Sequence, residues 1–340
     1  MKLVFFSFIH RHRYKDLNNF LNSRIYGKYY MLNLGGPLKH FVAKLLIFLK
    51  IGKTISCDGK PLIVDKSRGI NFWMRGTILN IPQTFRNLNN NVVSIYHPLL
   101  QNKKIFQLYP INIKKIKIQN HLKIIYISRI NTETNIEERN IWEKYKFQIT
   151  ENFCLIDDKK FWEKIVSNNM SEEKKLVLYR KLKLLLRFEI IKNLKKKFNK
   201  ELVLIGNDWN YYSINSLPST DYSIKKNRQI YKGNICLDLG CIEGSSSLYH
   251  RSNQIIESGG LIIQSFQSDG KKMWGDLHDK ILFKNLPNLI SLLEKLLNDK
   301  KYCSTILEKI YNNFINSDKS IEKSLDKVLN MHNQIETSSL

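Results

Sequence analysis

The sequence predicts an α/β protein with two domains, each built on a parallel sheet, and three observations support this fold class. Apolar runs of strand length alternate with stretches of helical periodicity, most clearly between residues 233 and 265. The chain has 340 residues, which is more than one ordinary hydrophobic core accommodates. Hydrophobic residues make up 43% of the chain, as in globular proteins.

The N-terminal part opens with an apolar run at residues 3–9, which predicts a strand buried on both faces. A second strand is expected at 29–34, directly before Gly35-Gly36. The remaining elements expected here are helices at 16–25 and 38–49 and short strands at 62–64, 92–96 and 105–108.

The Lys- and Ile-rich run at 111–118 is the expected domain boundary. It gives a first domain of residues 1–118, a second domain of residues 119–318, and a C-terminal helix or tail at 319–340.

The second domain is expected to begin with a strand at 122–129. A long helix should start after Ser171, which is a good N-cap residue, because apolar residues then recur at helical spacing with lysines between them. The other expected elements are a strand at 202–205, the loop Gly206-Asn207-Asp208 after it, and closing helices at 289–296 and 303–314.

The most informative stretch is a predicted βαβ unit. A buried strand at 235–239 leads through the polar loop 243–247 into a helix at 248–257. Gly259-Gly260 ends this helix, and the next strand follows at 261–263. The loop then lies at the carboxyl end of a strand and the amino end of a helix, where backbone N–H groups favour an anion.

The charge of the chain is strongly positive, with 55 Lys and Arg residues against 30 Asp and Glu, a net charge of +25. The lysines are spread along the whole sequence, whereas a dedicated nucleic-acid surface would be more clustered. We therefore expect no specific nucleic-acid partner. Weak peripheral contact with an anionic membrane surface is the second interpretation of this charge.

Cysteine usage and apolar segments indicate a cytoplasmic protein, peripheral at most to the inner face of the membrane. The five cysteines are scattered and form no CxxC pair, which favours a reducing compartment over disulfides or a zinc site. The run at 3–9 is followed at once by basic residues without a cleavage site. The longest apolar stretch, 41–51, is too short to span a bilayer.

Residues 251–261, RSNQIIESGGL, resemble the nucleotide-sugar segment of GT-B glycosyltransferases. The resemblance is to the group-1-like branch that includes spore-maturation glycosyltransferases, which typically reads Arg-x-Phe-Glu-Ala-x-Ala-x-Gly-Gly. Arg251 and the double glycine match this pattern, while Gln254 stands where the family has a glutamate that holds the donor ribose. Ser246 stands where the wider superfamily often has an acidic residue that contacts the sugar.

The resemblance implies two Rossmann-like domains that face each other across a cleft, with the nucleotide sugar held by the second domain. Arg129 matches an arginine that binds the donor diphosphate, and the lysine that usually follows is missing. Gln254 can still hydrogen-bond a ribose hydroxyl, because an amide carries both donors and an acceptor. The residues expected to bind the nucleotide sugar are Arg129, Gly206, Asn207, Ser245, Ser246, Arg251 and Gln254.

The function expected on this resemblance is transfer of a sugar from a nucleotide-sugar donor to a glycan, lipid-linked or small acceptor. The reaction needs no metal and no cofactor besides the donor. Glu257 is expected to orient Arg251, and the catalytic base stays unassigned among His10, His12, His40 and His97. Two alternatives remain: a glycosyltransferase-like protein that binds without catalysis, given Gln254 and Ser246, and a basic nucleic-acid-binding protein.

Overall fold

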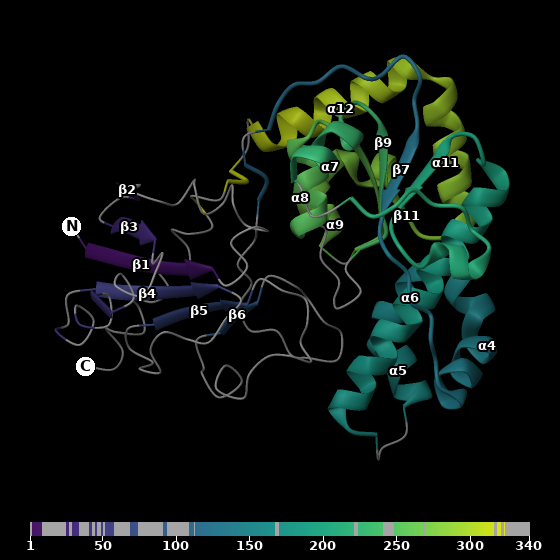
Figure 1. Cartoon of the computed structure of the whole chain (residues 1–340), viewed down its shortest axis with the longest axis horizontal. Coiled ribbons are helices and arrows are strands. Elements are labelled where there is room, and N and C mark those ends of the chain that lie inside the picture. Colours follow the sequence, from purple (N-terminus) through teal and green to yellow (C-terminus); the bar gives the residue numbers. More distant parts are fainter. Residues whose placement is uncertain are drawn as a thin grey trace. The chain divides into compact units, whose positions relative to one another are not determined.

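The structure is a computed structural model, shown in Figure 1. It divides into two compact units, one made of Met1–Tyr96, Asn102–Ile111 and Asp318–Leu340, the other of His97–Gln101 and Asn112–Ser317. The predicted boundaries at residues 118 and 318, and the predicted cleft between facing domains, stay predictions. The described residues are 2–8, 25–26, 29–33, 41–42, 45, 49, 52–57, 69–73, 91–93, 109–111, 113–166, 170–220, 224–240, 248–267, 269–315, 318–320 and 323.

The sheet of the first unit has the strand order β2-β3-β1-β4-β5-β6, and all its neighbours pair in parallel except β2 with β3. The strands expected at 3–9 and 29–34 are confirmed by β1 and β3, and β6 overlaps the one expected at 92–96. The strands are β1 Lys2–Phe8, β2 Ile25–Tyr26, β3 Tyr29–Asn33, β4 Gly52–Cys57, β5 Gly69–Trp73 and β6 Asn91–Val93.

Three strands of this sheet were not expected: β2, β4 and β5. β4 begins at Gly52, three residues after the end of the helix expected at 38–49, and β5 contains the aromatic pair Phe72-Trp73. The strands expected at 62–64 and 105–108 lie outside the described residues, as do residues 16–24 of the helix expected at 16–25. Ile25, the last residue of that helix, belongs to β2 instead.

The second unit contains a five-stranded sheet, β11-β10-β9-β7-β8, in which every pair is parallel. Numbered along the unit, its strands lie in the order 2-1-3-4-5, and the parallel strands of the first sheet lie in the same order. The second unit is therefore a Rossmann-like α/β fold. Its strands are β7 Ile124–Ile127, β8 Leu202–Ile205, β9 Ile235–Asp238, β10 Leu261–Ser265 and β11 Leu282–Phe283.

An unusually long crossover joins β7 to β8. It contains α4 Ile136–Glu151, the 3₁₀ turn η2 Phe153–Asp157, α5 Lys159–Ile165 and α6 Glu172–Lys197, and Figure 1 shows α4, α5 and one end of α6 projecting beyond the sheet. Ser171 caps α6 as expected, because its side chain accepts a hydrogen bond from the Lys174 N–H.

The remaining helices of the second unit follow the predicted order. The expected helix 248–257 is α8 His250–Glu257, and the closing helices are α11 Leu286–Asn298 and α12 Lys300–Ile315. The other elements are η3 Trp209–Tyr212, α7 Ile224–Tyr231, α9 Gly270–Trp274, η4 Gly275–Leu277 and α10 His278–Ile281.

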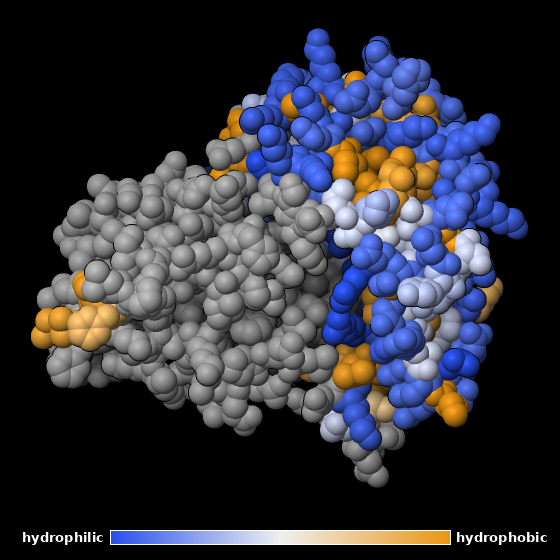
Figure 2. All heavy atoms as spheres, in the orientation of Figure 1, coloured by the Kyte–Doolittle hydropathy of each residue, from blue (hydrophilic) through white to orange (hydrophobic). Residues whose placement is uncertain are grey.

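The core of the second unit lies against its central strands, which are apolar and fully covered. Every residue of β9 and β10 is buried, as expected for parallel strands with helices over both faces. On the face shown in Figure 2, hydrophilic residues spread over the described surface of this unit, with apolar residues in patches between them. No helix of the described residues is both long enough and apolar enough to cross a membrane.

Candidate functional site at the carboxyl edge of the second sheet

The strand order directs attention to one place on the second sheet. In a sheet of order 2-1-3-4-5, the chain leaves the first and third strands in opposite directions, and ligands bind outside the carboxyl ends of these strands. Here those strands are β7 and β9, which pair directly. The residues that follow β7 and β9, together with the start of α8, therefore form the candidate site.

The predicted residues Arg129, Gly206 and Asn207 lie at this edge. Arg129 and Asn207 are exposed, directly after β7 and close after β8. Two hydrogen bonds join these loops: the Ser128 N–H donates to Ile205 O (2.9 Å), and the Ile130 N–H to Asn207 O (3.4 Å).

Gly206 is required for this close approach of the two strand ends. Its φ of +146° lies in a region that side chains disfavour, and a Cβ at this position would overlap the Ser128 carbonyl. The indole of Trp209 also donates to Ser128 O at 2.6 Å. Asp208 is the N-cap residue of η3 and makes no side-chain capping hydrogen bond.

The polar loop that carries Ser245 and Ser246 lies outside the described residues. Arg251 is the second residue of α8, so it lies in the first turn of the helix, and Gln254 follows one turn later, partly buried.

Asp238, the last residue of β9, is the centre of a buried hydrogen-bond network that the sequence analysis missed. Its side chain is 0% exposed. Four groups donate to its carboxyl group: the Tyr249 hydroxyl (2.6 Å), the Ser252 hydroxyl (2.7 Å), the Gln264 amide (2.8 Å) and the Gly240 N–H (3.1 Å). None of the four donors is a cation, so the network satisfies the carboxyl oxygens without neutralising a basic residue.

This network fixes the start of α8 against the ends of two strands. Ser252 Oγ also accepts from the Tyr249 N–H (3.3 Å), while Gln264, which donates to Asp238, accepts from the Trp274 indole (3.2 Å). Gly240 has a φ of +75°, and a Cβ there would approach Gln267 Nε2 to 2.5 Å. The turn after β9 is therefore held in one conformation.

Arg251 enters this corner from α8 and is partly buried. Its Nη1 atom is buried and has no hydrogen-bond partner. The guanidinium lies over the ring of Tyr126 at 5.9 Å, and the buried hydroxyl of Tyr126 also lacks a partner. Within the described residues, Arg251 makes no ion pair. Burial of a cation without a partner is costly, and the first turn of a helix, where its dipole repels cations, adds to the cost.

Arg187 brings a second buried cation to the same corner from α6. It is 6% exposed, and its Nη2 donates to the carbonyl of Gly240, which also lies 3.0 Å from the Tyr249 hydroxyl. Its Nε is buried without a partner, and no carboxylate of the described residues pairs with it. In the sequence Arg187 lies between Leu184–Leu186 and Phe188, an apolar context that was the available signal for its burial and that the sequence analysis missed.

Both guanidinium groups act electrostatically on Tyr249. Burial and the neighbouring Asp238 raise the pKa of the Tyr249 hydroxyl well above its ordinary value, and the charges of Arg251 and Arg187 act in the opposite direction. The corner thus gathers two cations around one phenol and one carboxyl group. An anionic ligand is the partner that such an excess of buried positive charge favours.

Glu257 does not orient Arg251, contrary to the expectation. It accepts an ion-paired hydrogen bond from Arg228 of α7 at 3.1 Å, and its side chain is 10% exposed. The helical spacing that suggested a pair with Arg251 is correct, but α7 packs beside α8 and presents a closer cation.

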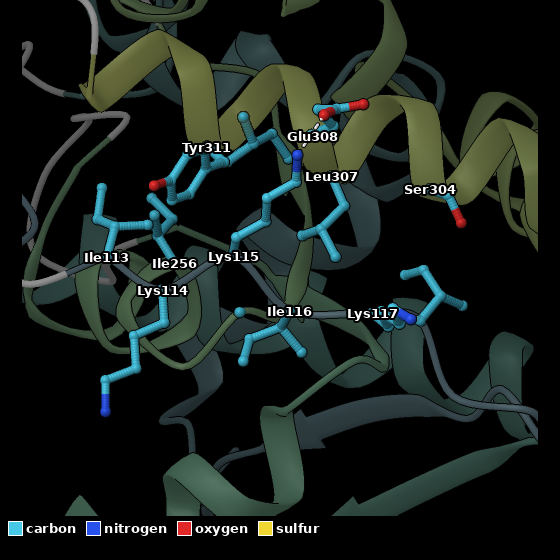
Figure 3. Close-up of a pocket in the computed structure, with 13 residues that line it drawn as sticks. Ile113, Lys114, Lys115, Ile116, Lys117, Ile256, Ser304, Leu307, Glu308 and Tyr311 are labelled. Carbon is cyan, nitrogen blue, oxygen red and sulfur yellow. Dashed lines mark hydrogen bonds and ion pairs between the residues drawn. The ribbon is translucent and has the colours of Figure 1, made fainter.

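A separate groove lies at the other end of α8, with a volume of 340 Å³ (Figure 3). The segment 113–118 runs along it beside α12, and Figure 3 shows Lys115 directed toward Glu308, with which it makes an ion pair of 2.6 Å, while Lys114 points away. In the described ranges, no cluster of His, Cys, Asp and Glu residues offers ligands for a metal ion.

No family model matches the sequence, and no curated protein matches it. Among the solved structures it is similar to the crystal structure of TarM, at 12% sequence identity and a TM-score of 0.36. The match covers 94% of this chain and 57% of TarM. A likeness at that TM-score supports no conclusion about this chain. The described residues of this chain form a Rossmann-like unit. Where the chain direction reverses between β7 and β9, this unit has a cationic corner that is only partly compensated.

Proposed function

We propose that the protein is a glycosyltransferase whose second unit holds a nucleotide-sugar donor at the carboxyl edge of its sheet. The observation that carries this proposal is the partly buried Arg251 in the first turn of α8, whose Nη1 atom is buried and has no hydrogen-bond partner. A phosphate group there would pair with the cation and also meet the positive end of the helix dipole. The match of Arg251 and Gly259-Gly260 to the donor segment of GT-B glycosyltransferases supports the same assignment.

The roles of the other residues follow from their places. Arg129 and Asn207 are exposed just after β7 and β8, at the same carboxyl edge of the sheet. They can therefore contact the phosphates and the nucleotide. Ser245 and Ser246 are proposed to contact the donor from the loop before α8, and Gln254 to hydrogen-bond a ribose hydroxyl. Gly206 keeps the loops after β7 and β8 close together.

Sugar transfer from a nucleotide-sugar donor requires that the leaving diphosphate be stabilised. The bond between the anomeric carbon and the diphosphate oxygen breaks, and the acceptor hydroxyl oxygen bonds to that carbon and loses its proton. Negative charge grows on the diphosphate as it leaves, where preorganised guanidinium groups stabilise it. Positive charge from arginines makes a metal unnecessary for this step, and the acceptor is proposed to be a glycan, a lipid-linked sugar or a small molecule.

The proposal is tested by calorimetric titration of the full chain with a set of nucleotide sugars, comparing wild type with Arg251→Ala. We expect at least one donor to bind with micromolar affinity and Arg251→Ala to weaken it by about a hundredfold, the loss of roughly two charge-assisted hydrogen bonds. Arg228→Ala is the matched control, because Arg228 contacts α8 through Glu257 and should leave donor affinity unchanged. Binding of no nucleotide sugar, or equal binding by Arg251→Ala, would contradict the proposal.

Binding without catalysis is the second candidate function, favoured by Gln254 and Ser246 where the family has acidic residues. The two functions separate in one assay: incubation with the bound donor and detection of released nucleoside diphosphate, with and without candidate acceptors. Release that depends on Arg251 supports the enzyme. Tight binding with no release over the whole acceptor set supports the binding protein.

A further inference from the structure

We infer that Arg187 is a further anion-binding residue of the site at the carboxyl edge, beside Arg251 and Arg129, and that Arg187 and Arg251 together select a ligand with two adjacent phosphates. The inference rests on the proposed function and adds its charge specificity. It arises from the buried Nε of Arg187, which has no partner, in a side chain that is 6% exposed.

The two arginines approach the corner from different elements. Arg187 extends from α6, which belongs to the crossover from β7 to β8, whereas Arg251 stands in α8, which follows β9. Arg187 donates to the Gly240 carbonyl, and Tyr249, next but one to Arg251 in sequence, lies 3.0 Å from that same carbonyl through its hydroxyl. Both guanidinium groups also act electrostatically on the Tyr249 hydroxyl, so the two arginines share one neighbour.

The positive charge of Arg187 and Arg251 is only partly compensated by the residues that the structure describes. Asp238 acts electrostatically on Arg251, and its oxygens already accept four hydrogen bonds from neutral donors. Neither Arg187 nor Arg251 forms an ion pair with a residue that the structure describes, and each has a buried nitrogen without a hydrogen-bond partner. Orthophosphate offers a single phosphate group to the two guanidinium groups, whereas a diphosphate offers each guanidinium its own phosphate.

A purely structural role for Arg187 predicts something different. If Arg187 served only to brace Gly240, one donor would suffice, and a substitution would change stability without changing which anions bind. The readout that separates the two roles is the preference for pyrophosphate over orthophosphate, measured on folded protein.

The experiment titrates the full chain with inorganic pyrophosphate and with orthophosphate by calorimetry, at matched ionic strength because such binding is screened by salt. Four proteins are compared: wild type, Arg187→Ala, Arg187→Lys and Arg180→Ala. Arg180 lies on the same helix two turns earlier and serves as the matched control. Thermal unfolding of each variant, with and without anion, establishes that it is folded and gives a second measure of binding.

We expect wild type to bind pyrophosphate at least tenfold more tightly than orthophosphate. Arg187→Ala should lose this preference while keeping its affinity for orthophosphate within about threefold, because Arg251 remains. Arg187→Lys should keep part of the preference, since it retains the charge but not the planar fork. Arg180→Ala should behave as wild type.

Each outcome assigns failure to one proposal. An unchanged preference in Arg187→Ala and Arg187→Lys overturns the role of Arg187 and leaves the donor site intact, provided that Arg251→Ala still loses binding. Absence of binding of pyrophosphate and of every nucleotide sugar to wild type overturns the donor site itself. If Arg187→Ala unfolds, the Arg187→Lys variant provides the test. A preference for pyrophosphate over orthophosphate equal to that of wild type in Arg187→Lys, with Arg180→Ala also unchanged, contradicts recognition by the guanidinium fork.

Discussion

The two ends of α8 compare two environments of a partly buried arginine. Near the C-terminal end, Arg228 pairs with Glu257 at 3.1 Å. In the first turn, Arg251 lies over the ring of Tyr126 with a buried nitrogen that has no hydrogen-bond partner, although a buried carboxyl group, Asp238, acts on it electrostatically. A cation that pairs with an acid contributes to the fold, whereas one that is kept from an acid costs stability and remains available to a ligand.

The network around Asp238 explains why Arg251 stays without a carboxylate. Four neutral donors occupy the oxygens of Asp238 and tie them to the start of α8 and the end of β10. The carboxyl group is thereby used to position the helix. Asp238 therefore positions α8, while Arg251 is left without an ion pair, and substitutions at the two ends of α8 test these separate roles.

The largest effect is expected from Asp238→Ala. The substitution leaves the Tyr249, Ser252 and Gln264 donors buried without an acceptor, and it should lower the free energy of unfolding by about 4 kcal/mol. Urea denaturation followed by circular dichroism measures this change. Asp279→Ala is the control, because the Asp279 side chain is 96% exposed. A stability equal to that of wild type would show that the network does not hold α8.

Gly259→Ala tests the C-terminal end of the same helix. Gly259 has a φ of +71°, and a Cβ there would overlap the side chain of Ile116. Left-handed backbone and steric overlap together should lower the free energy of unfolding by about 3 kcal/mol. Gly275→Ala meets no atom within 4 Å of its Cβ, so its cost is backbone strain alone; its φ of +53° and ψ of −126° are open chiefly to glycine, and the loss should be about 2 kcal/mol. Equal losses in the two variants would mean that the segment 113–118 yields to the added methyl group.

Substitution of Arg251 and substitution of Arg228 are expected to change the free energy of unfolding in opposite directions. Arg251→Met removes a buried cation that lacks an ion pair and keeps the packing on Tyr126, so the free energy of unfolding without ligand should rise by about 1 kcal/mol. Arg228→Met leaves the partly buried Glu257 without its cation and should lower the same quantity by about 1 kcal/mol, a value reduced by the solvent exposure of Arg228. Donor binding should be lost only in Arg251→Met. Chemical denaturation in low salt measures both changes, and a loss of stability in both variants would remove the distinction between the two ends.

The sequence predicted the second unit well because its elements are marked by local patterns. Fully apolar runs identified β9 and β10, Ser171 marked the start of α6, and Gly259 marked the end of α8. In the first unit, β4 was missed because Gly52 and Lys53 begin a strand with residues that are typical of turns.

The site was only partly predictable, for a physical reason. Arg251 was found because it belongs to a short motif, but Arg187 is separated from Gly240 by 53 residues, so no local motif joins them. Asp238 ended an apolar strand, and a polar residue at the carboxyl end of a buried strand was the available signal for it. Such partners depend on how strands and crossover helices converge, which periodicity does not encode.

The smallest effect is expected from Gln254→Glu, which introduces the glutamate of the resembled family one turn after Arg251. The Gln254 side chain is partly buried and makes no hydrogen bond with a described residue, so the free energy of unfolding should change by less than about 0.5 kcal/mol. Spacing of three residues lets the new carboxylate approach Arg251, yet the ribose hydroxyl also gains a stronger acceptor, so donor affinity should stay within about threefold. Calorimetry and urea denaturation measure both quantities. Asp238 alone is expected to position α8. Failure of Gln254→Glu to fold would therefore mean that position 254 also fixes the helix. The contrast between the two ends of α8 would then lose its basis.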